Sequence, residues 1–403
     1  MGEIEKKQPQ RRFAGFTDDW EERKLGEVAK YRNGKAHEND ICEDGIYIVV
    51  NSKFISTNGE VKKYSAKQIE PLCKNEIAFV LSDVPNGRAI ARTFLVEKDD
   101  KYTLNQRIAG ITPNENITPY FLHILMNRNK YFLQFDDGAK QTNLSVNDVM
   151  EFEEYYPTGA EQEQIGIFFR NLDNRITLHQ RKLDKVKALK AACLTEMFPA
   201  EGETKPKRRF AGFTDDWEQR KISDYGEFYY GHSAPKWSVT EDATIPCVRY
   251  GELYTKFGAK IDKIYSYTNI AKENLRFSKG TEVLIPRVGE DPMDYNHCTW
   301  LSLSDVAIGE MISVYNTDQN PLFTAIMFNA TLQKEFARRV EGGSVTNLYY
   351  EKLKNIKVSF PSISEQEQIA TYFEHLDHLI TLHQRKLEKL QNLKQAYLNE
   401  MFV

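Results

Sequence analysis

A long stretch that occurs twice constrains this chain more than any other feature. The first copy begins with Glu-Gln-Glu-Gln-Ile at 161–165, continues through Ile-Thr-Leu-His-Gln-Arg-Lys-Leu at 176–183 and ends with Glu-Met-Phe at 196–198. The same three segments return in the same order at 365–369, 380–387 and 400–402. An internal repeat on this scale indicates that one architectural unit is used twice.

Each copy predicts a long helix with one apolar face. The apolar positions alternate steps of four and three, which is the heptad pattern of a coiled coil. In the first copy these positions are Ile165, Phe169, Leu172, Ile176, His179, Leu183, Val186, Lys190, Cys193 and Met197. In the second copy they are Ile369, Phe373, Leu376, Ile380, His383, Leu387, Leu390, Lys394, Tyr397 and Met401. We interpret the two histidines as polar residues that fix the helix register, in preference to a ligand or catalytic role.

The two predicted helices also begin alike. Thr158 with Glu161, and Ser362 with Glu365, have the spacing of a capping box, and each pair follows a proline.

The two apolar faces are expected to pack against each other. Because a whole domain lies between the copies, we favour an antiparallel coiled coil. A helix of this length spans roughly 55 Å, at about 1.5 Å per residue. The alternative is that each helix packs on its own domain.

A second repeat divides the chain into matched halves. The motif Arg-Arg-Phe-Ala-Gly-Phe-Thr-Asp-Asp-Trp-Glu occurs at 11–21 and again at 208–218, and each copy precedes a variable block and a long helix. The sequence therefore predicts a lead-in at 1–10, a domain at 11–157, a helix at 158–199, a linker at 200–207, a domain at 208–361 and a second helix at 362–403.

Both variable blocks predict small mixed domains. Runs of β-branched and aromatic residues predict strands at 46–50, 76–81, 282–285 and 311–315. Proline introduces a predicted helix in each block, at 119–126 and 322–328. We therefore predict the α+β class: two domains of similar fold in a pseudo-two-fold repeat, separated by an antiparallel coiled coil.

Composition sets broad limits on the location and partners of the chain. The 403 residues carry a formal net charge of −4, which by itself counts mildly against a nucleic-acid binder. No apolar run is long enough to span a bilayer. The five scattered cysteines are typical of reduced thiols in a cytoplasmic protein, and form neither a zinc pattern nor a disulfide framework.

The sequence lacks the motifs of an independent catalyst. It contains no phosphate-binding GxxxxGK[ST] segment, no GxGxxG after a strand and no clustered Cys/His pattern for a metal. Asp83 and Asp291 are conceivable nuclease carboxylates, but neither has the neighbouring acidic residue and lysine that such a site needs. We therefore predict no catalytic residue and no metal ligand in this chain.

Polar residues suited to reading base edges gather in the variable blocks. Arginine pairs with guanine, and asparagine or glutamine with adenine, in the major groove. The candidates in the first block are Arg32, Lys35, Asn51, Lys53, Asn86, Arg88, Gln106, Arg107, Lys140, Gln141 and Asn143. Those in the second block are Lys236, Arg249, Tyr250, Arg287, Ser344 and Asn347. For each residue taken alone, the simpler interpretation is a solvated loop residue. The prediction of base reading therefore depends on the whole group of residues.

Taken together, these motifs closely resemble the DNA specificity subunit of type I restriction-modification systems. The resemblance covers essentially the whole chain. It depends on Phe-Ala-Gly-Phe at 13–16 with Trp20-Glu21, on Lys-Leu-Gly-Glu-Val at 24–28, on the Glu-Gln-Glu-Gln-Ile segment, on Leu172-Asp173 with Ile176-Thr177, and on their second-half copies. Family members often carry a second proline where Thr158 and Ser362 follow theirs, which leaves the assignment unaffected.

The resemblance implies a role for each part of the chain. Each variable block would be a target recognition domain that reads one half of a bipartite, asymmetric DNA site. The helix pair would set the spacing and dock two methyltransferase subunits, which modify adenine using S-adenosylmethionine; motor-nuclease subunits using ATP and Mg would be further partners. The chain itself would bind no cofactor and catalyse nothing.

The sequence leaves open two alternatives from other functional classes. One is a structural coiled-coil adaptor that makes no contact with bases. The other is an enzyme that acts on nucleic acid by itself, against which the missing motifs argue.

Overall fold

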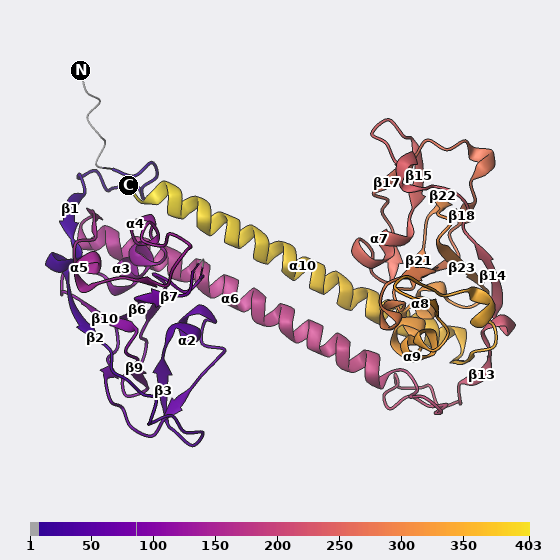
Figure 1. The fold of residues 1–403 in the computed structure, drawn as a ribbon, viewed down its shortest axis with the longest axis horizontal. Helices are drawn as coiled ribbons and strands as arrows, with labels where there is room; N and C mark the ends of the chain where they lie inside the picture. The colour runs from indigo at the N-terminus through magenta and orange to yellow at the C-terminus, as the bar shows by residue number, and fades with distance from the viewer. Residues whose placement is uncertain (1–7, 86) are drawn as a thin grey trace. The chain divides into compact units, whose positions relative to one another are not determined.

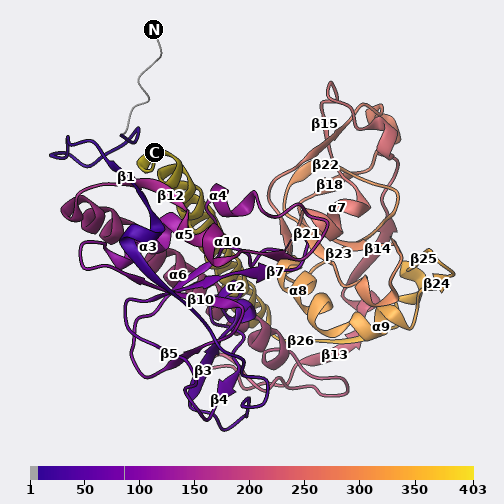
Figure 2. The same cartoon turned by 60° about the vertical axis from the view of Figure 1, so that its left-hand side comes forward.

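The computed structural model describes residues 8–85 and 87–403. The chain divides into two compact units, the first formed by residues 1–180 with 385–403 and the second by residues 181–384 (Figures 1 and 2). Most of the predicted lead-in, and the candidate Asn86, lie outside the described residues. Among the residues described, no helix has the length and apolar character needed to cross a membrane.

The first unit contains two small sheets and two short ribbons. One antiparallel sheet has the order β2 (Ala29–Asn33), β10 (Ile108–Pro113), β6 (Ile77–Val80) and β8 (Thr93–Leu95). The other has the order β4 (Tyr64–Ser65), β3 (Tyr47–Val50), β9 (Tyr102–Leu104) and β5 (Pro71–Leu72), with β3 and β9 parallel. The ribbons pair β1 (Glu21–Lys24) with β12 (Glu153–Tyr156), and β7 (Ser82–Asp83) with β11 (Thr142–Asn143). The short helices are α1 (Leu25–Val28), α2 (Ser52–Ser56), α3 (Pro119–Met126), α4 (Lys130–Leu133) and α5 (Val146–Met150).

The second unit repeats this plan with longer strands. Its main sheet has the order β14 (Gly226–Tyr230), β23 (Ile312–Thr317), β19 (Glu282–Pro286), β21 (Thr299–Leu301) and β16 (Lys260–Ile261). A second sheet has the order β17 (Ser266–Thr268), β15 (Ile245–Val248), β22 (Ser304–Ile308) and β18 (Phe277–Lys279). The ribbons are β20 (Val288–Gly289), β25 (Thr346–Asn347) and β24 (Glu341–Gly342), and separately β13 (Glu218–Lys221) with β26 (Lys357–Phe360). The α-helices are α7 (Tyr250–Thr255), α8 (Pro321–Thr331) and α9 (Gln333–Ala337), and the 3-10 turns are η1 (Ile222–Asp224), η2 (Lys236–Ser238), η3 (Lys272–Asn274), η4 (Pro292–Asp294) and η5 (Tyr350–Lys352).

The predicted long helices are α6 (Gly159–Glu196) and α10 (Ile363–Met401), and they pack antiparallel in both units (Figure 1). In the first unit, Lys394 Nζ lies 2.6 Å from Asp173 Oδ1, and the rings of Phe168 and Tyr397 are 4.9 Å apart. Residue numbers therefore rise along α6 as they fall along α10.

The second unit contains the equivalent half of the helix pair. Lys190 forms an ion pair with Asp377, and Cys193 Sγ lies 3.7 Å from the Tyr372 hydroxyl oxygen. The antiparallel coiled coil is confirmed, and the alternative of separate helices is wrong. The heptad positions Ile165, Phe169, Leu172, Leu183, Ile369, Phe373 and Leu376 are buried, and Ile176, His179, Ile380, His383 and Leu387 are half-buried.

Each core is completed by the far end of a long helix. In the first unit, the Phe402 ring lies 6.4, 5.6 and 6.0 Å from the rings of Trp20, Phe121 and Phe169. Because Phe402 comes from the end of the chain, the first core needs residues from both ends of the sequence.

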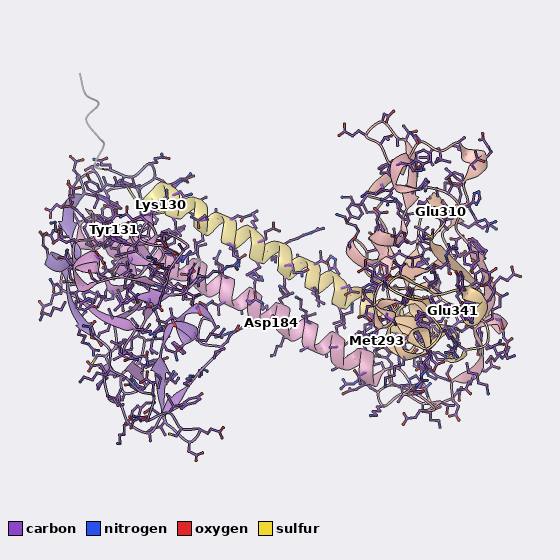
Figure 3. The ribbon with its side chains drawn as sticks, viewed as in Figure 1. Lys130, Tyr131, Asp184, Met293, Glu310 and Glu341 are labelled. Carbon is purple, nitrogen blue, oxygen red and sulfur yellow. The ribbon has the colours of Figure 1, made fainter. Side chains whose placement is uncertain are left out.

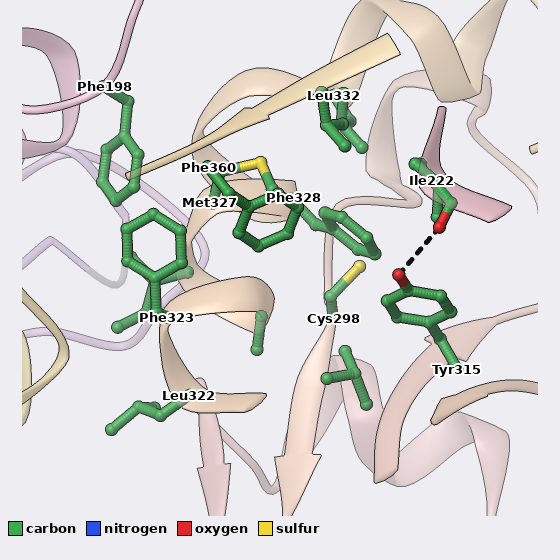
Figure 4. Close-up of a cluster of buried hydrophobic side chains, with 14 of the residues drawn as sticks. Phe198, Ile222, Cys298, Tyr315, Leu322, Phe323, Met327, Phe328, Leu332 and Phe360 are labelled. Atoms are coloured by element: carbon green, nitrogen blue, oxygen red, sulfur yellow. Dashed lines mark hydrogen bonds between the residues drawn. The ribbon is translucent and has the colours of Figure 1, made fainter. Parts of the chain in front are cut away.

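The second core has the same arrangement around Phe198. Its ring lies 6.3, 5.7 and 6.0 Å from Trp217, Phe323 and Phe373. Figure 4 shows Phe198 and Phe323 in this core, with the Tyr315 hydroxyl donating to the Ile222 carbonyl at 2.9 Å.

The glutamates at the starts of the two long helices bind the arginine of the repeated motif that precedes each domain. Arg12 donates to both carboxylate oxygens of buried Glu161, at 2.9 and 2.7 Å, and the Trp20 indole donates at 3.3 Å. Arg209 holds Glu365 in the same way, at 2.9 and 2.7 Å. The two glutamates thus anchor the arginine–aromatic motif at 11–21 and 208–218, because the buried arginine offers each a stronger charged partner.

Candidate nucleic-acid interface

In each unit, the central strand pair of the main sheet ends in the same way: β6 and β10 in the first unit, β19 and β23 in the second. We call this place the sheet end; its backbone connections are alike in the two units and its side chains differ. In the first unit Val80 pairs with Ile108, so Leu81 and Arg107 are the next cross-strand neighbours, and the Leu81 amide donates to the Arg107 carbonyl at 3.1 Å. The Leu144 amide in turn donates to the Leu81 carbonyl at 2.8 Å. This bond attaches the β7–β11 ribbon to the sheet end.

The second unit has the same backbone connections. Pro286 pairs with Ile312, and the Arg287 amide donates to the Met311 carbonyl at 3.2 Å. The Leu348 amide donates to the Arg287 carbonyl at 2.8 Å, which attaches the β20–β25 ribbon. Leu81 therefore corresponds to Arg287, and Arg107 corresponds to Met311.

Several predicted residues meet at the ribbon of the first unit. Gln141 Nε2 donates to Ser82 Oγ at 2.8 Å and to Asn143 Oδ1 at 3.2 Å, and Asn143 lies opposite Ser82. Lys140, which precedes Gln141, is exposed, as is Arg107 at the sheet end. The ribbon thus brings an arginine, a lysine and two amide side chains together at one edge.

Asp83 organises the loop that follows this ribbon. Its carboxylate accepts hydrogen bonds from the backbone amides of Val84, Ala89 and Ile90, at 2.9, 2.5 and 3.0 Å. Asp83 therefore shapes the loop that presents exposed Arg88. Asp291 likewise accepts from the Met293 amide at 2.8 Å, at the start of η4. In both loops the aspartate that might have been a nuclease carboxylate orders local backbone.

A cluster of arginines beside that loop was missed by sequence reasoning. Arg92 Nε donates to the Arg88 carbonyl at 2.6 Å, and Arg128 Nη1 donates to the Ile90 carbonyl at 3.2 Å. Burial, and then the charges of Arg128 and Arg88, lower the pKa of Arg92. The three arginines come from two separated segments, and no spacing in the sequence brings them together.

At the ribbon of the second unit, Arg287 lies on an aromatic platform. Its guanidinium carbon is 4.9 Å from the centroid of Tyr230, whose ring lies 4.4 Å from Tyr350. The Tyr230 hydroxyl donates to Glu351 at 2.7 Å, and burial raises the pKa of Tyr230. Figure 2 shows β24 and β25 together at one edge of this unit.

The remaining ribbon candidates of the second unit flank Arg287. Asn347 lies between Val288 and Glu341 in the register of the three strands, and Figure 3 labels Glu341. Ser344 is exposed in the turn between β24 and β25. The arginine, the asparagine and the serine therefore belong to one ribbon.

Two predicted residues of the first unit lie in a structural ion-pair network. Arg32 donates to both Glu76 oxygens, at 3.2 and 2.8 Å, and also pairs with Glu70. Lys35 Nζ lies 2.9 Å from Glu70. Burial acts to raise the pKa of Glu70, but hydrogen bonds from Lys35 and Arg32 outweigh it and leave the pKa below its ordinary value. This geometry favours a role in holding the sheet edge, because both cations already have carboxylate partners.

Other candidates lie after corresponding strands of the smaller sheets. Asn51 caps α2 by accepting from the Phe54 amide at 2.9 Å, and Arg249 occupies the same place before α7. Lys53 and Tyr250 follow them and are exposed, as is Lys236 in η2. Gln106 donates to Glu38 at 2.7 Å. Trp237 is 73% exposed beside Lys236.

The described part of the chain contains no group of three or more His, Cys, Asp or Glu residues placed to hold a metal ion. All five cysteines are free thiols.

Comparison with known proteins assigns the fold to a family. The family model described as "Type I restriction modification DNA specificity domain" matches residues 17–188 and 214–392. A putative type I restriction enzyme specificity subunit, MjaX, from Methanocaldococcus jannaschii is 21% identical over 95% of this chain and 93% of its own length. The MjaVIII specificity subunit of the same organism is 19% identical over 95% of this chain and 92% of its own length.

A solved structure has the same fold. The S subunit of a type I restriction-modification system from M. genitalium superposes with a TM-score of 0.65 at 15% identity, covering 98% of this chain and 99% of that one. Because the family model matches both halves of the sequence, and the repeat that it describes is present in the structure, this chain belongs to the family of type I restriction-modification DNA specificity subunits.

Proposed function

We propose that the chain reads a bipartite, asymmetric DNA sequence as the specificity subunit of a type I restriction-modification complex. The observation that carries this proposal is the matched sheet end with its attached ribbon, which has one backbone geometry and two different sets of side chains. Similar domains with different polar surfaces are what reading two unlike half-sites requires.

In this proposal the chain is the reader and not the catalyst. Two methyltransferase subunits would dock on the helix pair and transfer a methyl group from S-adenosylmethionine to adenine. Restriction subunits would add ATP- and Mg-dependent cleavage, and the complex would act in the cytoplasm. The exposed apolar side chains Ile167 and Leu178 support a docking surface on the part of α6 that belongs to the first unit, because their spacing of eleven residues places them along one line of the helix.

Exchange of one block tests the bipartite model. Residues 24–157 are replaced by the corresponding block of a related subunit, and the methylated sequence is mapped in cells that also express the methyltransferase partner. We expect one half of the methylated sequence to change and the other half to stay the same. An unchanged sequence, or a change in both halves, would contradict the model.

The adaptor alternative makes a different prediction. If the chain touches no bases, alanine at Arg88, Arg107 and Arg287 leaves the DNA affinity of the assembled complex and its salt dependence unchanged. The reader model instead predicts weaker binding, and a shallower dependence of the binding constant on salt if any of these arginines contacts phosphate.

A further inference from the structure

The Arg287 side chain is held in place, but the hydrogen-bond donors of its guanidinium lack strong acceptors. Its backbone is fixed by hydrogen bonds to Met311 and Leu348, and its guanidinium is stacked on Tyr230 at 4.9 Å. The Nε atom is buried and has no hydrogen-bond partner. Among the described residues, Nη2 donates to the thioether sulfur of Met311 alone, at 3.0 Å. A thioether is a weak acceptor.

Arg287 also has no ion-pair partner among the described residues. Within residues 8–85 and 87–403, no carboxylate lies within ion-pair distance of its guanidinium, whereas the nearby Lys352 pairs with Glu341. Stacking on a tyrosine face restricts a guanidinium while leaving its edge free to donate. Arg287 is therefore preorganised to donate to an acceptor supplied from outside the chain.

The first unit contains the counterpart of this arginine on the neighbouring strand. At the position of Arg287 it has Leu81, which is 8% exposed, and at the position of Met311 it has Arg107. Arg107 is exposed, and no ion pair or side-chain hydrogen bond joins its guanidinium to another residue of the described ranges. Each sheet end thus has one arginine and one apolar residue at the same cross-strand pair of positions, in exchanged order.

We propose that, in each half of the protein, this cross-strand pair of positions holds an arginine that reads a guanine. The arginine is Arg287 in the second half and Arg107 in the first. The inference rests on the proposed function and deepens it. The O6 and N7 atoms of guanine present two adjacent acceptors in the major groove, which match the planar donor fork of arginine.

The exchanged order has a consequence for the target sequence. Neighbouring strands are about 4.8 Å apart, whereas successive base pairs are about 3.4 Å apart along the duplex axis. Where the line between the two strands runs along the duplex axis, moving the arginine from one strand to the other displaces its guanidinium by about one base-pair step. The two guanines should lie at different distances from the unread spacer between the half-sites.

The experiment uses the complete chain assembled with its methyltransferase partner. The methylated sequence is first mapped by methylome sequencing of cells expressing the complex. Synthetic duplexes with that sequence then carry 7-deaza-2′-deoxyguanosine at one guanine at a time, which removes only the N7 acceptor. Equilibrium binding is measured for the wild type, Arg287→Gln and Arg107→Gln.

We expect Arg287→Gln to weaken binding roughly tenfold or more. One deaza substitution in one half-site should weaken wild-type binding and have no further effect on this variant. Arg107→Gln should show the same non-additivity at a guanine of the other half-site. Arg338→Gln is the control, because that exposed arginine already pairs with Glu201 and Glu335, and it should bind like the wild type.

A second variant separates base reading from phosphate binding. Arg287→Lys keeps the charge and loses the planar fork, so it should bind more weakly than the wild type and respond less to the deaza base. If Arg287→Lys instead binds like the wild type and Arg287→Gln weakens binding to every sequence equally, the arginine contacts phosphate and the inference is wrong.

Two other outcomes would also overturn the inference and leave the bipartite function intact. One is a half-site that contains no guanine. The other is a deaza effect that adds to the effects of both arginine variants. Failure of the wild-type complex to methylate any bipartite sequence would defeat the proposed function as well. Thermal melting and co-purification with the partner confirm that each variant is folded.

Discussion

At the scale of single residues, Glu161 shows how strongly one buried carboxylate can organise a unit. Its side chain is 1% exposed and that of Arg12 is 10% exposed. Replacing Glu161 by alanine would leave the arginine buried without a partner. We expect this to destabilise the first unit by about 3–5 kcal/mol, measured by urea unfolding with hydrogen exchange to identify the unit. Glu218→Ala, which removes the exposed partner of Arg220, should leave the free energy of unfolding nearly unchanged. Equal effects of the two variants would contradict the argument.

His123 makes the first unit sensitive to acid. Burial lowers its pKa from 6.5 to about 4, the charges of Lys394 and Arg170 also lower it, and Asp173 opposes them. Between these values the unfolded chain binds a proton that the folded chain does not, so stability falls as pH drops from about 6.5 to 4. The full effect is about 3 kcal/mol.

Replacing His123 by leucine should remove this part of the pH dependence. The measurement is the free energy of unfolding of the first unit at pH 7, 5.5 and 4. His378→Leu, which changes an exposed histidine of α10, is the control and should keep the wild-type slope. A slope that persists in His123→Leu would show that another group is responsible.

The chemistry of individual residues was only partly predictable. Arg287 and Arg107 could be selected by type, since arginine is the usual partner of guanine. Arg32 is of the same type but forms ion pairs with Glu70 and Glu76, whose distance along the sequence hides them. The Tyr230 platform and the arginine cluster around Arg92 depend on contacts between separated segments, which no local pattern encodes.

At the scale of elements, the helix pair depends on its half-buried apolar positions. Glutamate at both Ile176 and Ile380 would place charge against the facing helix, and we expect the helices to separate and partner docking to be lost. The assay is co-purification with the methyltransferase subunit, with melting of each unit measured in parallel. Glutamate at the exposed neighbours Thr177 and Thr381 is the matched control and should leave docking intact. Docking that survives the isoleucine changes would refute this role.

Elements with their own periodicity were predictable, and elements defined by pairing were not. Pro119–Met126 is helical over the predicted range, because proline and an apolar run encode it locally. The strands β7 and β11 have two residues each and exist only because they pair with each other across a long separation in sequence. The surface proposed to read DNA consists largely of such ribbons.

At the scale of the whole molecule, the last residues stabilise the first unit. We expect Phe402→Ala to destabilise that unit by roughly 2–3 kcal/mol, less than for a fully buried phenylalanine because Phe402 is half-buried. Hydrogen exchange should increase in residues 8–180 and stay unchanged in the second unit. Phe198→Ala, at the equivalent position, should give the reverse pattern. Exchange that rises in both units with either variant would contradict this division.

The position of Phe402 in the first core also bears on how the protein is made. Residues 385–403 are synthesised after the whole second unit, so the first unit must wait through the synthesis of that unit before its core can close. During that interval Trp20 and Phe121 lack one of their neighbours, and the nascent amino-terminal half remains open to chaperones and proteases. Complete synthesis of the second unit is therefore a condition for the first unit to become native.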